Sequence, residues 1–419
     1  MAGQPSHRRI LTASLVGTAV EFYDFYIYAT AAALVFGPLF FPSEQPGLDL
    51  LLSYASFSVA FFARPLGAVA FGHFGDRVGR KSTLVASLLI MGVSTFLIAF
   101  LPTYAMIGWG APVLLCLLRF GQGFGLGGEW GGAALLAVEN APEGKRARYG
   151  MFPQLGAPLG FIASNGLFLL LGLWLDDGDF IEWGWRLPFL ASALLVGIGL
   201  WVRLTLTETP AFAQALAHAP PPKVPFAALM RGHWREVVCG TLAAVACFAI
   251  FYLTTAFALG YGTKQLGIPR ETFLLYQLVS ILFLAGGIIV SGFLSDRYSG
   301  RAVLMTGCGL TVIVALMIEP LLGGSPVGIV SFLSAALFAM GLVYGPLGSW
   351  LPGLFPPLVR YSGASVSFNM AGILGGGLAP LVAQRLSDSY GLQAVGFYLA
   401  SCAGVSLLGL MMLGGRNAE

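Results

Sequence analysis

Long apolar runs alternate with short polar segments along the whole 419-residue chain. A helix needs about 20 mostly apolar residues to cross the hydrocarbon core of a bilayer, so runs of this length predict transmembrane helices. Twelve runs fit, at residues 11-36, 50-71, 83-101, 110-138, 149-172, 186-205, 237-260, 272-293, 302-322, 327-350, 362-384 and 392-413. The pattern predicts an all-α integral membrane protein with twelve transmembrane helices.

The composition supports lipid as the solvent of this chain. Hydrophobic residues make up 57% of the sequence and charged residues only 10%, and the mean hydropathy is +0.81. The 57 glycines and 24 prolines suit membrane helices, in which small residues allow close packing. The first run lacks a clear cleavage site, so we expect it to be retained as a helix.

Lysine and arginine mark every second connection, and such residues concentrate in cytoplasmic loops. These basic connections carry Arg8, Arg9, Arg77, Arg80, Lys81, Lys145, Arg146, Arg148, Arg203, Lys223, Arg231, Arg235, Arg297, Arg301, Arg360 and Arg416. The opposite connections hold acids, including Asp176, Asp177, Asp179 and Glu182. We therefore expect a multi-pass protein of a bacterial-type inner membrane with both termini in the cytoplasm.

The net charge of +3 reflects this bias between loops, because no loop forms the dense basic block that nucleic-acid binding requires. DNA and RNA binding are excluded on this ground. The five cysteines lie in apolar runs without CxxC spacing, which indicates buried thiols rather than a metal or redox site.

Two sequence echoes indicate that the chain consists of two related halves. The segment "GHFGDRVGRK" at 72-81 recurs as "GFLSDRYSGR" at 292-301, each between the second and third helices of its half. A polar, proline-rich stretch separates the halves. We expect a six-helix bundle over 1-205, a cytoplasmic linker over 206-236 and a second six-helix bundle over 237-419, with a solute site between the bundles near the midplane.

The pattern at Gly72, Asp76, Arg77, Gly79 and Arg80 resembles the signature loop of the major facilitator superfamily. More narrowly, the chain resembles the metabolite:proton symporters, the branch of shikimate, α-ketoglutarate, citrate and proline/betaine carriers. The resemblance is carried by "EFYDFYIY" (21-28), "FFARPLG" (61-67), "RFGQGFGLGGEWGGAALLAVENAP" (119-142), "WGWRLPF" (183-189) and "VRYSGAS" (359-365). It implies two pseudo-symmetric halves and alternating access.

Five charged residues fall inside the predicted helices, where each costs about 2.5–3.5 kcal/mol on insertion scales. They are Glu21, Asp24, Arg64, Arg119 and Glu129. Internal ion pairs that hold helices together are one interpretation. Three acids nevertheless face two arginines, which leaves one carboxylate without a cationic partner. A low dielectric favours the protonated form of such a group, as proton coupling requires.

The resemblance implies roles for two of these charges. In proton-coupled sugar carriers of the superfamily, an aspartate in the first helix pairs with an arginine in the fourth, and Asp24 and Arg119 resemble those positions. We expect Asp24 to carry the proton and Arg119 to tune it. Glu21 lies one helical turn before Asp24 on the same face and is the alternative proton site.

Arg64 is the expected anchor for solute, because a planar guanidinium suits the capture of a carboxylate. It could instead pair permanently with Glu129 or brace its own helix. Polar recognition is expected from Gln154, which resembles the position of a sugar-contacting glutamine in distant relatives, and from Tyr23, Asn165, Tyr252, Tyr276, Gln277 and Asn369. Each of these polar residues could equally form hydrogen bonds between helices.

The resemblance also implies a cytoplasmic gate. The residues expected to form it are Gly72, Asp76, Arg77, Arg80, Glu129, Glu139, Arg148, Asp296, Arg297 and Arg360. In the first half, Arg77, Arg80 and Arg148 are expected to pair with Glu139 and other acids. No glutamate in the second half corresponds to Glu139. The same arginines also serve to set the topology.

These observations predict a secondary transporter, not an enzyme, that imports a small organic solute together with a proton. The solute is expected to be a carboxylate. No cofactor is expected, since the proton gradient supplies the energy, and the partners are solute, proton and the lipid bilayer around a monomer. Alternatives are a uniporter, exchanger or efflux carrier, a carrier of a zwitterion such as betaine or proline, or a nontransporting membrane sensor.

Overall fold

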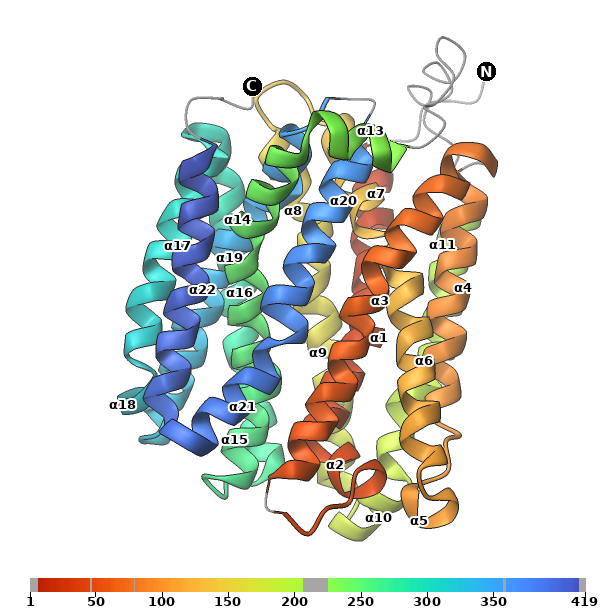
Figure 1. Ribbon diagram of the computed structural model, residues 1–419, viewed down its shortest axis with the longest axis vertical. Coiled ribbons are helices and arrows are strands. Elements are labelled where there is room, and N and C mark those ends of the chain that lie inside the picture. The colour runs from red at the N-terminus through yellow and green to blue at the C-terminus, as the bar shows by residue number, and fades with distance from the viewer. Residues whose placement is uncertain (1–6, 46, 79, 206–224, 357–358, 414–419) are drawn as a thin grey trace.

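The computed structural model describes residues 7-45, 47-78, 80-205, 225-356 and 359-413. Within these ranges the regular elements are helices, and they form one upright bundle (Figure 1). The chain is an all-α membrane protein whose twelve spans are arranged as two halves of six. The positions of the spans agree with the runs predicted from the sequence.

Several spans of the first half are interrupted. The long elements are α1 (His7–Leu34), α3 (Leu48–Val78), α4 (Arg80–Ile98), α6 (Gly110–Leu126) followed by α7 (Trp130–Glu139), α8 (Arg146–Gln154) followed by α9 (Gly156–Trp174), and η1 (Gly184–Arg186) leading into α11 (Leu187–Thr205). The short helices α2 (Phe36–Phe40), α5 (Tyr104–Ile107) and α10 (Asp177–Glu182) lie in connections between them.

The second half contains two segments of π-helix. Its elements are α13 (Pro225–Gly232), α14 (Trp234–Tyr252), the π segment η2 (Leu253–Phe257), α15 (Ala258–Lys264), α16 (Arg270–Arg297), α17 (Gly300–Leu316), α18 (Ile318–Leu322), α19 (Pro326–Gly353), α20 (Arg360–Ala371), the π segment η3 (Gly372–Gly377), α21 (Ala379–Tyr390) and α22 (Leu392–Met412). The expected linker over 206-236 is described only from residue 225, where α13 begins. The boundaries of the halves remain predictions.

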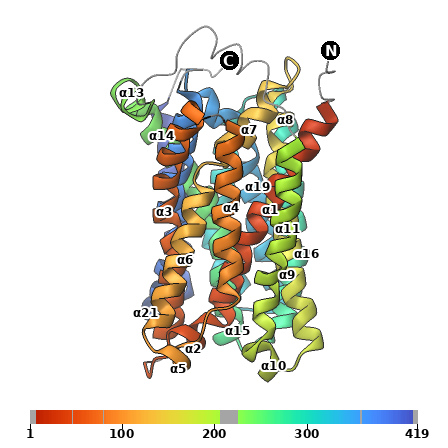
Figure 2. The same cartoon turned by 90° about the vertical axis from the view of Figure 1, so that its right-hand side faces the viewer.

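Two ends of the bundle are distinguished here by the elements found at them. α1 begins and α22 ends at the same end, which we call the terminal end (Figure 1). The short helices α5 and α10 lie at the opposite end, called the α10 end, and the view turned by 90° shows the same arrangement (Figure 2). The start of α1 and the end of α22 lie at the same end because the chain crosses the membrane an even number of times.

The helix breaks have local causes. Pro158 has no N–H to donate to the carbonyl of Gln154, one turn earlier, and α8 ends at that residue. The fourth span breaks at two glycines and Glu129, between α6 and α7. The sequence analysis predicted one continuous helix for each of the two runs that contain these breaks, 110-138 and 149-172.

The outer surface of the bundle is apolar. Phe62, Leu66, Leu117, Leu194 and Phe293 are each between 52 and 70% exposed. Exposure of this extent on many helices suits contact with lipid rather than water. Among the described residues, eight helical stretches are long and apolar enough to cross a membrane, and the apolar helices Val85–Ile98 and Gly300–Leu316 are shorter. The chain is a multi-pass membrane protein.

Close helix packing depends on small residues. A Cβ on Gly123 of α6 would lie 2.2 Å from the carbonyl oxygen of Ala60 on α3, and a Cβ on Gly341 of α19 would lie 2.7 Å from the Cα of Gly287 on α16. α16 packs extensively on α19, α1 on α9 and α14 on α22. Across the halves, α16 contacts α8 and α9, α19 contacts α8, and α20 contacts α3.

Candidate functional site

The five charges expected inside the membrane are all buried. Asp24 and Arg119 are 0% exposed, Glu129 is 1% exposed, Arg64 is 4% exposed and Glu21 is 6% exposed. Asp24 lies in α1 and Arg119 in α6, about nine residues from the start of α6 at the α10 end. The interior of the bundle therefore holds charges of both signs, and charges interact more strongly in a low dielectric than in water.

The carboxyl group of Asp24 lacks a hydrogen-bond partner. Neither of its oxygens has one within the described residues, although the side chains of Ser192 on α11 and Thr95 on α4 lie close to it. The backbone carbonyl of Asp24, in contrast, accepts a hydrogen bond from Gln122 at 2.7 Å. A buried carboxyl in this setting is more stable when it carries a proton.

Arg119 is enclosed by aromatic rings. Its Cζ lies 4.0 Å from the ring centroid of Tyr28, 4.2 Å from that of Phe25 and 4.8 Å from that of Phe57. The guanidinium donates to the carbonyl of Phe57 at 3.4 Å and to Oε1 of Gln122. Its Nη2 has no partner among the described residues. The predicted partners Asp24 and Arg119 form no direct ion pair in this structure.

Arg64 faces the same aromatic group from α3. Its Cζ lies 5.0 Å from the ring centroid of Phe25 and 5.4 Å from that of Phe61. Its Nε has no hydrogen-bond partner within the described chain, and Glu21 contributes a favourable charge nearby. The ring of Phe25 therefore contacts both buried guanidinium groups.

Rings from both halves complete this aromatic surface. Tyr252, at the end of α14, packs edge-on against Phe57 with centroids 5.2 Å apart and against Phe61 at 5.4 Å. Of the described residues expected to bind solute, Tyr252 contacts, together with Arg64, the rings around the buried arginines. Its place agrees with a site between the halves.

The other expected tyrosines have different surroundings. The hydroxyl of Tyr23 donates to the carbonyl of Pro188 on α11 at 2.9 Å, within the first half. Tyr276 is half-buried, with its ring centroid 6.2 Å from that of Phe273 on the same helix. The Tyr23 hydroxyl thus serves the packing of α1 against α11.

Gln154 forms hydrogen bonds in two directions. Its Oε1 accepts from the indole of Trp130 at 3.1 Å, and its Nε2 donates to the carbonyl of Tyr344 in the second half at 2.9 Å. Trp130 stacks on Phe368 of α20, with centroids 3.7 Å apart and ring planes 3° from parallel. The structure therefore places Gln154 in a contact between the halves.

Asn165 and Gln277 meet across the same interface. Asn165 accepts from Thr30 at 2.7 Å and donates to Oε1 of Gln277 at 3.3 Å. Gln277 donates in turn to the carbonyls of Thr254 and Thr255 in η2, at 3.0 and 2.7 Å. A π turn weakens the regular ladder of backbone hydrogen bonds, so an amide from another helix stabilises it.

The break between α6 and α7 also contacts the second half. Asn369 donates to the carbonyl of Gly127 at 2.9 Å, and the hydroxyl of Tyr361 donates to the carbonyl of Gly128. Glu129, the next residue, accepts a hydrogen bond from Ser87 at 2.6 Å. Helix breaks expose carbonyls for contacts of this kind. The role of Tyr361 was not predicted from the sequence.

An ion pair joins the halves at the terminal end. Nε of Arg148 lies 2.7 Å from a carboxylate oxygen of Asp296, which also accepts the backbone amide of Ala147 at 2.8 Å. In this structure Arg148 pairs with Asp296 and not with Glu139, its expected partner. Asp296 is favoured because it also caps the first turn of α8.

The remaining gating residues form weaker contacts or fall outside the description. Arg297 is exposed beside the ring of Tyr298, and Arg360 donates to the carbonyl of Phe355 at 3.2 Å. The side chains of four predicted gating residues lie outside the described part of the chain: Gly72, Asp76, Arg77 and Arg80.

Two further ion pairs join the halves at the α10 end. Lys264 lies 2.9 Å from Asp49, and Arg270 lies 2.9 Å from Asp177. The sequence suggests these pairs only indirectly, because Lys264 and Arg270 are rare bases among acidic connections. The structure is therefore held together at both ends.

Helix α3 adds two hydroxyl contacts to the π segments of the second half. Tyr54 donates to the carbonyl of Ala256 in η2 at 2.8 Å, and Ser58 donates to the carbonyl of Gly377 in η3. The two donors are four residues apart and hence share one face of α3. One helix of the first half therefore contacts both π segments.

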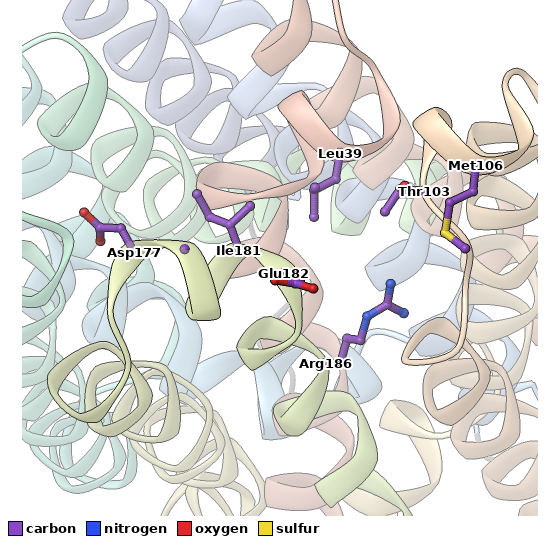
Figure 3. A pocket seen from close by; sticks show the side chains of 8 residues that line it. Leu39, Thr103, Met106, Asp177, Ile181, Glu182 and Arg186 are labelled. Carbon is purple, nitrogen blue, oxygen red and sulfur yellow. The ribbon is translucent and has the colours of Figure 1, made fainter.

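A pocket of about 600 Å³ opens at the α10 end (Figure 3). Glu182 and Arg186 come from one side, and Thr103 and Met106 come from the connection that contains α5. Asp177, which pairs with Arg270, also lines it. The pocket lies apart from the buried charges of α1, α3 and α6.

A family model described as Major Facilitator Superfamily matches residues 14–380. The chain belongs to this superfamily. The "Inner membrane metabolite transport protein YhjE" of Escherichia coli K12 is 50% identical and the match covers 97% of this chain and 94% of the relative. The shikimate transporter of the same organism is 38% identical, with 98 and 95% covered. A proline/betaine transporter of Salmonella typhimurium LT2 is 32% identical, with 96 and 82% covered.

Solved structures support the fold of this major facilitator protein. The proton:xylose symporter XylE bound to 6-bromo-6-deoxy-D-glucose matches with a TM-score of 0.75 at 16% identity, covering 97% of this chain and 95% of that one. A partially occluded inward open conformation of XylE from Escherichia coli matches with a TM-score of 0.74 at 14% identity, covering 97% of each chain. The protein is a membrane transporter of metabolites and not an enzyme, as the sequence predicted.

Proposed function

We propose that this transporter imports a small organic carboxylate together with a proton across the inner membrane. The observation that carries the proposal is the buried carboxyl of Asp24, which has no hydrogen-bond partner within the described residues. It lies in the same interior as two buried arginines. A carboxyl that is not fixed in an ion pair can gain and lose a proton during the transport cycle, as proton coupling requires.

Charge balance explains how the proton and the solute could depend on each other. Arg64 offers an unpartnered Nε beside the rings of Phe25 and Phe61. A carboxylate that binds there brings one negative charge, and protonation of Asp24 removes one. The net charge of the interior then stays constant through the cycle, which avoids the cost of moving charge through a low dielectric.

In the proposed transport cycle, residues 1-205 rock against residues 237-413 to give alternating access. The terminal end faces the cytoplasm. The Arg148–Asp296 pair would close the cytoplasmic side, and the Lys264–Asp49 and Arg270–Asp177 pairs would close the opposite side. Contacts at both ends support a closed intermediate of the cycle.

Solute chemistry is supported by the named relatives. Shikimate, proline and betaine each carry one carboxylate group, and proteins named for their transport match nearly the full length of this chain. One carboxylate is also what a single arginine can hold with two parallel hydrogen bonds. We infer a solute with one recognised carboxylate.

The proposal is tested by uptake into proteoliposomes that contain the purified protein. Radiolabelled shikimate, simple monocarboxylates and betaine are offered with and without an imposed pH gradient, acidic outside. Accumulation that requires the gradient and is lost in Asp24→Asn, while exchange of preloaded solute persists, is the expected result. Glu21→Gln is the matched variant, because it removes the alternative proton site one helical turn away. Uptake that ignores the gradient would indicate a uniporter or exchanger.

A carrier of zwitterions is the second candidate, supported by the proline/betaine relative. The aromatic group of Phe25, Phe57, Phe61 and Tyr252 could contact a quaternary ammonium, as aromatic cages do in other proteins. Competition between betaine and an anionic acid for uptake separates the two candidates, since only a zwitterion carrier prefers betaine.

A further inference from the structure

Gln122 joins the two buried groups that the proposed function uses. It lies on α6, one turn after Arg119, and is 0% exposed. Its Oε1 accepts from the Arg119 guanidinium, and its Nε2 donates to the backbone carbonyl of Asp24 at 2.7 Å and to the hydroxyl of Thr95 at 2.9 Å. The side chain thus connects α1, α4 and α6.

Chemistry fixes the orientation of this amide. A guanidinium can only donate hydrogen bonds, and the backbone carbonyl of Asp24 can only accept them. The Gln122 oxygen must therefore face Arg119 and the nitrogen must face Asp24. All three of the hydrogen bonds are used at once, so the amide cannot turn without losing more than one of them.

The position of the guanidinium follows from these contacts. Gln122, the carbonyl of Phe57 and the rings of Phe25 and Tyr28 hold Arg119, while the Asp24 carboxyl is left without a partner. The two groups are nevertheless linked through one side chain.

The other charged and titratable groups around Asp24 come from several elements. Among the described residues, Glu129 at the break between α6 and α7 and Tyr23 on α1 itself are the titratable groups that interact with Asp24. Glu21 on α1 acts instead on Arg64 of α3. α4 and α11 contribute the uncharged hydroxyls of Thr95 and Ser192. Arg119 is linked to Asp24 through the hydrogen bonds of Gln122.

We propose that Gln122 is a positioning residue that holds Arg119 away from the Asp24 carboxyl and thereby sets the pH range over which Asp24 exchanges its proton. The inference rests on the proposed role of Asp24 in proton coupling. A carboxylate paired directly with a guanidinium is strongly stabilised in its ionised form. Gln122 prevents that pair, so Asp24 can be protonated at the pH of the medium.

Two substitutions at this position predict different pH midpoints. Gln122→Met keeps the length of the side chain but removes the acceptor that holds Arg119, so the guanidinium can pair with Asp24. The pH of half-maximal uptake should then fall by about one unit or more, because an opposite charge nearby shifts proton binding by that amount. Gln122→Glu still holds Arg119, so the midpoint should stay where it is or rise.

The experiment measures gradient-driven solute uptake into proteoliposomes between pH 5 and 9 for the wild type, both Gln122 variants and Asp24→Asn. Gln384→Met is the matched control, since Gln384 is also a buried glutamine but lies on α21, where it donates to Asp388. Thermal unfolding of each purified variant reports on loss of fold. A merely structural role would lower activity in both Gln122 variants without separating their pH midpoints.

The possible outcomes distinguish this inference from the proposed function. A lower midpoint in Gln122→Met, together with a midpoint in Gln122→Glu that is not lowered and an unchanged Gln384→Met, supports the role of Gln122. If the wild type depends on pH through Asp24 but both Gln122 variants keep its midpoint, the inference fails and the proposed function stands. If uptake by the wild type does not depend on pH, the proposed function fails first. If Gln122→Met does not fold, Gln122→Asn, which is too short to hold Arg119 and Asp24 together, takes its place.

Discussion

Arg148 and Asp296 join the two halves through a carboxylate that does more than neutralise an arginine. Nε of Arg148 lies 2.7 Å from one oxygen of Asp296, and the carboxylate also accepts backbone amides of Ala147 at 2.8 Å and of Arg148 at 3.3 Å. The Asp296 side chain is 6% exposed, whereas that of Arg148 is 35% exposed. The first turn of α8 therefore contributes to this contact.

Asp296→Asn should open the terminal end. The substitution removes a charge-assisted contact worth about 1–3 kcal/mol, which is roughly a fivefold or larger shift toward open forms. A cysteine placed at Ser349 of α19, which lies against Gly150 of α8, should react with a thiol reagent about five times faster or more. Asp388→Asn, on α21, should leave that rate unchanged, and equal rates in all variants would show that Asp296 does not hold this end closed.

The α10 end should respond to salt more than the terminal end. In the Lys264–Asp49 pair the side chains are 36 and 22% exposed, and Asp177 in the second pair is 89% exposed. Exposed pairs contribute only about 0.2–1 kcal/mol and are screened by salt. A cysteine at Leu50, which is 2% exposed beside Gly260, should label faster at high salt and in Asp49→Asn. The cysteine at Ser349 provides the comparison and should change little with salt.

Arg64→Lys should weaken solute binding despite keeping the charge. The lysine ammonium cannot form two parallel hydrogen bonds to a carboxylate, and it stacks less well on Phe25 and Phe61. We expect the Kd, measured by isothermal titration calorimetry with a transported carboxylate, to rise about tenfold or more. Arg186→Lys, in η1 at the α10 end, is the control and should leave Kd unaltered. An unchanged Kd in Arg64→Lys would assign the anion to another group.

Gly127→Ala should destabilise the fold. A Cβ at this position would lie 2.0 Å from the carbonyl oxygen of Arg64, so α3 and α6 would have to separate. Overpacking of this kind costs about 1–3 kcal/mol and can cost more. Gly166→Ala on α9 is the matched control, because a Cβ there meets nothing within 4 Å and alanine favours a helix. Thermal unfolding in detergent should show a lower midpoint for the first variant only.

The membrane spans and the buried charges could be predicted from the sequence because both depend on local composition. A run of apolar residues specifies a helix in lipid, and a charge inside such a run must be buried in the bundle. Asp24, Arg64 and Arg119 were found in this way, and each is buried as expected.

Contacts between distant helices could not be predicted in the same way. Arg148 pairs with Asp296 rather than Glu139, and Asp296 also accepts the amide of Ala147 in the first turn of α8. The spacing of residues in the sequence does not reveal this arrangement. Gln122 was overlooked although it lies three residues after Arg119, on the same helix face. The pairs at the α10 end likewise depend on which connections meet across the halves.

The π segments η2 and η3 have a consequence for how the second half changes shape. A π turn contains one residue more than an α turn, so its conversion to regular α-helix rotates and translates everything beyond it. Tyr54 and Ser58 bind carbonyls of η2 and η3, and Gln277 binds two more in η2. Release of these donors would let α15 and α21, which follow the π segments, rotate and shift relative to α14 and α20.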